Sequence, residues 1–250
     1  MIENILNRDA LRRWSRAAKG AAHADLPELK RQAADAQKLR HHLNEVIFNA
    51  EHRLALPAIG SNAFQKPRNS DWSWRPELWR GPVPQIGIVA ADSQTTLGDE
   101  ATLFHDCRQS ELTLRQIRNT RARDLAPFGV RMDVFRFDGS FLSIALDLPK
   151  TAVEGLRKKH LLRINTIIET EKPLEIFARL NLRHGPNTEQ IVRELPLAQE
   201  DVWVEFDLAY TNINEKRMER AWLDVIFEGP EMNMVTVRDM TFSRSPRAEL

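Results

Sequence analysis

Polar and aromatic side chains alternate with apolar ones in two segments of the C-terminal half of this chain. Because a β-strand points successive side chains to opposite faces, every second residue of such a segment shares one face. The polar positions are Arg179, Asn181 and Arg183 in the first segment, and Trp203, Glu205 and Asp207 in the second. These six are the candidate ligand-binding residues.

Residues of these types are suited to recognising carbohydrates. Carboxylates, amides and guanidinium groups hydrogen-bond to pairs of hydroxyls, and an indole ring covers the apolar face of a sugar. If the strand that carries Arg163 and Asn165 lies beside both segments, those side chains and Asp224 join the same polar face. The alternative is a solvated sheet face on which arginines and carboxylates form cross-strand ion pairs.

No catalytic, metal or cofactor motif accompanies these residues. Glu205 and Asp207 are about 7 Å apart by strand rise, and such a pair serves glycoside hydrolysis only where it flanks a cleft. Cys107 follows His105 by two positions, which does not by itself give a nucleophile a positioned base. His41 and Glu45 are one helical turn apart, but two ligands do not form a metal site. We therefore expect no catalytic residue, no metal and no cofactor.

The period-two pattern recurs in about nine segments, and turn residues such as Asp138-Gly139 and Gly229-Pro230 close them. That number of strands suits two packed sheets better than one. We predict an α+β chain in which residues 100–250 form a jelly-roll-like antiparallel β-sandwich, preceded by a helical segment at 1–55. The expected strands are Ala101–Asp106, Glu111–Arg118, Arg131–Phe137, Phe141–Leu148, Leu161–Glu169, Leu174–Arg183, Asp201–Leu208, Ala221–Phe227 and Asn233–Ser243.

The first predicted helix, Ile2–Ala21, is amphipathic. Apolar residues that include Ile5, Leu6 and Trp14 share one face, and the other face is mostly basic. A helix of this composition can lie on an anionic membrane surface. The alternative is that it packs on the rest of the protein or frays.

The second predicted helix, Leu26–Leu54, follows Asp25 as its N-cap and carries a near-heptad apolar stripe that only Arg40 interrupts. Such a stripe pairs with its copy in a second subunit, or it packs within the chain. The first option predicts a homo-oligomer formed through Leu26–Leu54.

Residues 56–99 are rich in Pro and contain Trp72, Trp74 and Trp79. Repeated Pro disfavours a long helix or a central strand. We expect a linker that covers the sandwich with its indoles, and the alternative is a stacking platform for sugar rings or bases.

Composition narrows the function further. The chain has 250 residues, a net charge of +1 and one Cys, which argues against a nucleic-acid surface and excludes an internal disulfide. Charged residues interrupt the first 22 positions, so they do not form a secretory signal. We expect a cytoplasmic location, with peripheral contact at the inner membrane face through Ile2–Ala21 as a further option.

Several strings resemble those of an alphaproteobacterial protein family of unknown function. They are Trp72–Trp79, Leu103–Cys107, Phe135–Phe141, Ala178–Asn181, His184–Asn187 and Ser245–Leu250. The resemblance covers most of the chain and implies no activity, cofactor or catalytic residue.

The leading hypothesis is therefore a non-enzymatic binding or assembly module with a carbohydrate-like ligand. A structural scaffold peripheral to the cytoplasmic membrane is the alternative, and a glycoside hydrolase or esterase is the third hypothesis.

Overall fold

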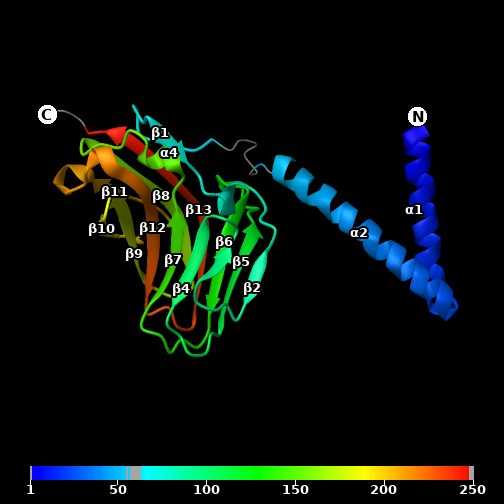
Figure 1. The fold of residues 1–250 in the computed structure, drawn as a ribbon. Coiled ribbons are helices and arrows are strands. Elements are labelled where there is room, and N and C mark those ends of the chain that lie inside the picture. The colour runs from blue at the N-terminus through cyan, green and yellow to red at the C-terminus, as the bar shows by residue number, and fades with distance from the viewer. Residues whose placement is uncertain (1, 55, 57–62, 248–250) are drawn as a thin grey trace. The chain divides into compact units, whose positions relative to one another are not determined.

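The structure, a computed structural model, describes residues 2–54, 56 and 63–247, with side chains for all of these except residues 2–7, 52 and 53. The expectations for the side chains of Ile2, Ile5 and Leu6 and for the end of the chain at Leu250 lie outside this part. The chain divides into two compact units, Met1–Ala50 and Glu51–Leu250. Figure 1 shows both units.

The first unit is helical, as the sequence predicts. It contains α1 (Ile2–Gly20), a short 3-10 turn η1 (Ala21–His23) and α2 (Leu26–Leu54). Asp25 caps α2 as expected, because its Oδ1 accepts the backbone N–H of Glu28 at 2.8 Å. Of the helices in the described part of the chain, none is long and apolar enough to cross a membrane.

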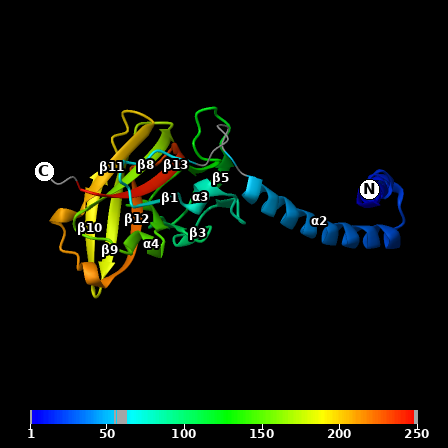
Figure 2. The ribbon, with the colours of Figure 1, turned by 90° about the horizontal axis from the view of Figure 1, so that it is seen from above.

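The second unit is an antiparallel β-sandwich, which confirms the predicted fold class. One sheet has the order β11-β8-β13-β6-β5-β2, with β1 also paired to β13, and the other has the order β10-β9-β12-β7-β4-β3. We call them sheet A and sheet B. In the view of Figure 2, β11, β8 and β13 of sheet A lie along one side of the sandwich and β10, β9 and β12 of sheet B along the other.

The bounds of the strands follow the sequence pattern closely. Sheet A contains β1 (Trp72–Trp74), β2 (Gly87–Val89), β5 (Leu112–Arg118), β6 (Phe128–Val134), β8 (His160–Thr170), β11 (Asp201–Asp207) and β13 (Asn233–Pro246). Sheet B contains β3 (Thr95–Leu97), β4 (Ala101–His105), β7 (Leu142–Asp147), β9 (Glu175–His184), β10 (Asn187–Glu194) and β12 (Met218–Glu228). Short helical turns connect some of them: α3 (Glu77–Arg80), α4 (Lys150–Val153), η2 (Leu208–Tyr210) and η3 (Glu215–Arg217).

Alternation along the strands builds the core between the two sheets. Phe206 of β11, Phe227 of β12 and Phe242 of β13 are among the largest fully buried side chains. Burying side chains of this size is the main driving force for closing such a sandwich. The other face of each strand is left for polar residues, which is where a binding site can form.

The Pro- and Trp-rich segment is part of the sandwich, and this corrects the expected boundary at residue 100. It contributes β1, α3, β2 and β3, and Trp72–Trp74 pairs with Phe242–Arg244 of β13. Trp79 is 3% exposed and its Nε1 donates to the carbonyl of Val237 at 2.9 Å. The indole of Trp79 is therefore a core side chain and is unavailable for stacking on a ligand.

Strand β10 is absent from the expected set. Its sequence, Asn187–Glu194, has only Ile191 and Val192 as apolar residues. It pairs with β9 across the turn at Gly185, and it forms one edge of sheet B. An edge strand can form with few apolar residues. The sequence of β10 therefore lacks the alternation of apolar and polar residues from which the other strands were predicted.

Candidate functional site

The outer face of sheet B carries rows of side chains that cross four strands. Arg179 of β9 lies opposite Asp224 of β12, which lies opposite Ala145 of β7, which in turn lies opposite Thr102 of β4. On one side of this central row, Gln190, Asn181, Trp222 and Asp147 form a second row. On the other side, Phe177, Ile226, Ser143 and Phe104 form a third.

A groove of about 620 Å³ lies over these rows. In the central row, the side chains of Ala145 and Thr102 are short. They are therefore lower than the larger side chains of the rows on either side. Trp222 and Ile226 are four residues apart on β12, about 13 Å by strand rise, and Asp224 lies between them on the same face. The lining residues are Thr102, Phe104, Phe141, Ser143, Ala145, Asp147, Arg179, Asn181, Gln190, Arg220, Trp222, Asp224 and Ile226.

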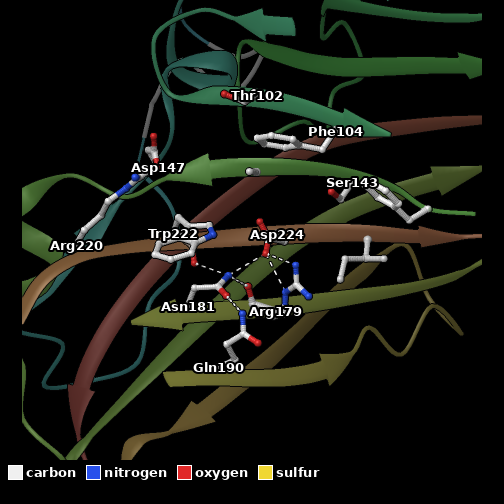
Figure 3. Close-up of a pocket in the computed structure, with 13 residues that line it drawn as sticks. Thr102, Phe104, Ser143, Asp147, Arg179, Asn181, Gln190, Arg220, Trp222 and Asp224 are labelled. Carbon is white, nitrogen blue, oxygen red and sulfur yellow. Dashed lines mark hydrogen bonds and ion pairs between the residues drawn. The ribbon is translucent and has the colours of Figure 1, made fainter. Parts of the chain in front are cut away.

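A hydrogen-bond network fixes the polar end of the groove, as Figure 3 shows. Asp224 Oδ2 accepts from Arg179 Nε and Asn181 Nδ2, both at 2.9 Å. Asn181 Oδ1 in turn accepts from Gln190 Nε2 at 2.7 Å. Because each planar group is held by the next, the network is set in place before a ligand arrives, and that lowers the entropy cost of binding.

Within the described residues, the network leaves binding capacity on its exposed side. The hydrogen bonds and the ion pair of Asp224 all use Oδ2, so Oδ1 receives no hydrogen bond from the described part of the protein. The side chain of Arg179 remains 37% exposed beside it. A carboxylate oxygen and a guanidinium edge side by side match a pair of neighbouring hydroxyls.

Trp222 provides the aromatic surface of the groove. Arg220 lies over its ring at 5.2 Å from the centroid, and Arg220 Nε donates to Asp147 Oδ1 at 3.2 Å. Phe104 lines the groove from β4, and Phe141 lines it from the residue just before β7. The groove thus joins apolar rings with planar hydrogen-bonding groups.

Charge in the groove is balanced. It contains two arginines and two aspartates, and they form the pairs Arg179–Asp224 and Arg220–Asp147. A groove without net charge gives no electrostatic preference for an anionic or a cationic ligand. The groove therefore combines paired charges with aromatic rings.

The structure divides the six predicted site residues between two faces. Arg179 and Asn181 line the groove, and the suggested Asp224 does so as well. Arg183 lies on the same strand but pairs with Glu219, with Nε and Oε2 3.3 Å apart. The expectation that all six share one face is therefore wrong, because β9 pairs with β10 and β12 and not with β8 or β11.

The other three predicted residues lie on β11 of sheet A. Arg163 is stacked on the ring of Trp203 at 4.0 Å and its Nε donates to Glu205 Oε1 at 2.9 Å. Asp207 Oδ1 accepts from the N–H of Ala209, and its Oδ2 lies 3.5 Å from Arg247 Nη1. This arrangement is the cross-strand ion pairing that was the alternative interpretation of the polar face.

The sequence interpretation did not single out several residues of the groove. Trp222, Gln190, Asp147, Arg220, Phe104, Phe141 and Thr102 belong to this group. A signal for Trp222 was available, because it shares a strand face with Asp224 between the buried Ala221 and Leu223. The missing information was the order of the strands, which a single sequence does not display.

The other chemical candidates form no site in the described part of the chain. His41 Nε2 and Glu45 Oε1 lie 3.6 Å apart on exposed side chains, and the described residues contain no group of three that could hold a metal ion. Burial raises the pKa of the Cys107 thiol, which disfavours the nucleophilic thiolate.

A family model described as a family of unknown function, DUF6478, matches residues 1–250. The chain belongs to this family. The match confirms the expected membership in a family without assigned activity. No curated protein matches the chain in sequence.

Solved structures with a similar sandwich bind or act on different ligands. One is a family 11 carbohydrate-binding module from Clostridium thermocellum in complex with a β-1,3-1,4-mixed-linked tetrasaccharide, with 9% identity, coverage of 66% of this chain and 99% of that one, and a TM-score of 0.38. A CBM22-1 xylan-binding domain from Paenibacillus barcinonensis has 8% identity, coverage of 65% and 95%, and a TM-score of 0.37.

The enzymatically active domain of a bacteriophage CBA120 tailspike protein has 7% identity and a TM-score of 0.41, and the likeness covers 57% of this chain but 19% of that one. The chain therefore spans only a small part of that enzyme.

Proposed function

We propose that this protein is a non-enzymatic carbohydrate-binding module whose ligand lies in the groove on the outer face of sheet B. The observation that carries the proposal is the pairing of the Trp222 ring with the fixed network of Asp224, Arg179 and Asn181 in one groove. A sugar presents an apolar ring face and hydroxyls at its edge, and this groove offers one surface for each.

The charge balance supports a neutral glycan as the ligand. Both arginines of the groove are paired with aspartates, so a sulfated or uronic-acid chain would find no unpaired cation there. The aspartates are likewise held in ion pairs, and their role in the proposal is to orient hydroxyls. The binding free energy comes mainly from burying the indole and one sugar face.

The groove is also accessible. None of its lining residues comes from the Trp72–Trp79 segment, which instead extends sheet A through β1. A chain of sugar rings lying across the strands would contact the Trp222 side and the Phe104 side in turn. We therefore expect the ligand to be an extended glycan and not a single buried sugar.

The test is glycan binding by the full chain, first on an array of neutral and acidic polysaccharides and then by calorimetry with the best neutral ligand. Trp222→Ala should weaken binding at least tenfold, since an aromatic anchor at the centre of a site commonly contributes 2 kcal/mol or more, about thirtyfold. The matched control is Trp203→Ala on sheet A, where the side chain is equally aromatic and the residue is 50% exposed. It should leave affinity unchanged.

Two results would overturn the proposal. One is a folded wild-type protein that captures no neutral glycan. The other is a loss of affinity in Trp203→Ala as large as that in Trp222→Ala, which would move the ligand to sheet A.

A further inference from the structure

An exposed apolar stripe runs along α2. With Leu26 as position a of a heptad, positions a are Leu26, Ala33, Arg40, Ile47 and Leu54, and positions d are Leu29, Ala36, Leu43 and Ala50. All of these lie in the described part of the helix, and none is buried. Leu26 is 79% exposed, Leu43 50%, Ile47 53% and Leu54 76%. Apolar stripes of this size and period are the seams along which helices pair.

Helix α1 does not occupy this seam. The side chains of α2 that line a space together with α1 residues Arg13, Trp14, Arg16 and Ala17 are Glu28, Arg31, Gln32 and Asp35. In the same heptad frame Glu28 and Asp35 are at position c, Arg31 is at position f and Gln32 is at position g. The described side chains of the first helix therefore lie on the c and f side of α2 and reach position g only at Gln32, while positions a and d of α2 do not line this space.

The residues that flank the seam distinguish the two possible orientations of a pair. Positions g include Leu39 and Val46, which are 36% and 65% exposed, and positions e are Lys30, Gln37, Asn44 and Glu51. In a parallel pair each g residue meets an e residue of the other chain, so Val46 would face Glu51. Arg40 would also face its own copy in the core. Both contacts are unfavourable.

An antiparallel pair resolves both conflicts. It brings g residues to g and e residues to e, so Leu39 meets Val46 of the second copy and Lys30 meets Glu51. In the register that places Leu29 opposite Leu54, Arg40 lies opposite Leu43, and Ile47 lies opposite the small Ala36. The flanking charges are then complementary and the apolar g residues widen the seam.

We propose that two copies of this chain pair through α2 as an antiparallel coiled coil over residues 29–54. The overlap is about 38 Å long at 1.5 Å per residue. The C-terminal ends of the two helices lie at opposite ends of the coil, and each chain continues from there into its own sandwich. A pair of this kind carries two copies of the groove, and, on the basis of the proposed function, two grooves on one polysaccharide would bind with avidity.

Sedimentation equilibrium of the full chain is the first test. We expect a dimer, and Ile47→Glu should raise its dissociation constant at least tenfold because it buries a charge opposite Ala36 in the seam. Lys38→Glu is the matched control at an exposed position f, and its dissociation constant should stay within twofold of the wild type. A wild-type monomer at about 0.1 mM, where even weak specific dimers associate, would overturn the pairing.

Disulfide trapping is the second test and decides the orientation. In a Cys107→Ser background, a mixture of Leu39→Cys and Val46→Cys chains should form a crosslinked heterodimer on oxidation. Ala36→Cys should not crosslink to itself, since its copy lies about 16 Å away along the coil in the antiparallel register. Self-crosslinking of Ala36→Cys without the mixed product would show a parallel pair and overturn the proposed orientation.

Discussion

Asp106 holds Ser140 through both of its carboxylate oxygens. Oδ2 accepts from Ser140 Oγ at 2.6 Å, and Oδ1 accepts from the backbone N–H groups of Ser140 at 2.7 Å and Phe141 at 3.1 Å. These bonds tie the loop before β7 to the end of β4 and place Phe141 at the groove. Two of the strings that carry the family resemblance, Leu103–Cys107 and Phe135–Phe141, meet at this contact.

The first prediction concerns pH. The hydrogen bond from the Ser140 hydroxyl, followed by that from the N–H of Phe141, lowers the pKa of Asp106 below its ordinary 3.8. A lowered pKa in the folded state means that ionised Asp106 stabilises the fold above pH 3.8, and that this contribution is lost as pH falls through the lowered value. Asp106→Asn should therefore melt below the wild type at neutral pH.

The difference between Asp106→Asn and wild type should shrink in strongly acidic buffer, where both side chains are neutral. Melting temperatures measured at a series of pH values test this expectation. A difference that stays constant down to about pH 2, well below the usual carboxyl range, would show that the carboxylate charge is not what stabilises the loop.

The second prediction uses Gly139 in the same loop. A Cβ at this position would lie 2.5 Å from Asp106 Oδ1 and 3.0 Å from both the backbone nitrogen and the Sγ of Cys107. Since backbone atoms of a neighbouring segment cannot move aside cheaply, Gly139→Ala should destabilise the protein by about 1–3 kcal/mol in urea unfolding. Gly155 is no suitable control because its φ is +69°, but Gly20 is one, since an added Cβ there has nothing within 4 Å.

Gly20→Ala should leave stability unchanged or raise it slightly, by up to about 1 kcal/mol, because Ala restricts the unfolded chain. Gly139→Ala should also reduce glycan affinity, since it displaces the loop that carries Phe141. Equal stabilities for the two variants would contradict the close packing at Gly139.

The third prediction concerns the ion pair that joins the Trp-rich segment to the last strand. Arg75 Nε and Nη2 lie 2.9 and 2.8 Å from Asp239 Oδ1 and Oδ2, and the two side chains are only 4% and 6% exposed. Burial raises the pKa of Asp239 although hydrogen bonds from Arg75 favour its charged form. Removing one partner would therefore leave the other poorly solvated.

Asp239→Asn or Arg75→Met alone should cost about 3–5 kcal/mol, whereas the double variant Arg75→Met with Asp239→Leu should cost much less. Chemical denaturation of the three variants measures this. The exposed pair Arg183–Glu219 is the control, and its loss should change stability by no more than about 1 kcal/mol. Additive losses in the double variant would show that the two charges do not depend on each other.

Local alternation was enough to predict the sandwich. Along β9 and β11 the apolar side chains fall on every second residue, and the structure buries these residues in the core. The short strands β1, β2 and β3 were not predicted, because proline residues in this segment disfavour strand formation. These strands form by pairing with longer neighbours, such as β13 for β1 and β5 for β2.

The groove could be predicted only in part, for a topological reason. Periodicity assigned Arg179 and Asn181 to one face of their strand, and Trp203 and Glu205 to one face of theirs. It contains no information on whether these strands are neighbours. The chain passes from β9 to β10 within sheet B and then crosses to β11 in sheet A, so the two sets lie on different sheets. A crossover of this kind is set by long-range packing.

The last prediction separates binding from stability with two matched arginines. Arg179 in the groove and Arg163 on sheet A each present Nε and Nη2 to one carboxylate oxygen, at 2.9 and 2.8 Å to Asp224 and at 2.9 Å for both contacts to Glu205. Both side chains are partly exposed, at 37% and 25%. Arg163→Gln should therefore lower stability by no more than about 1 kcal/mol. Arg179→Gln should cost more, because it leaves the carboxylate of Asp224, which is only 9% exposed, with the hydrogen bond from Asn181.

Their effects on glycan binding should differ. Arg179→Gln removes a hydrogen-bond donor beside Asp224 Oδ1 and should weaken affinity by about tenfold or more, as expected for the loss of one charged hydrogen bond. Arg163→Gln should leave affinity unchanged. Thermal melting and calorimetry on the same samples give both quantities. If both variants lose affinity in proportion to their loss of stability, Arg179 supports the sheet and does not contact the ligand.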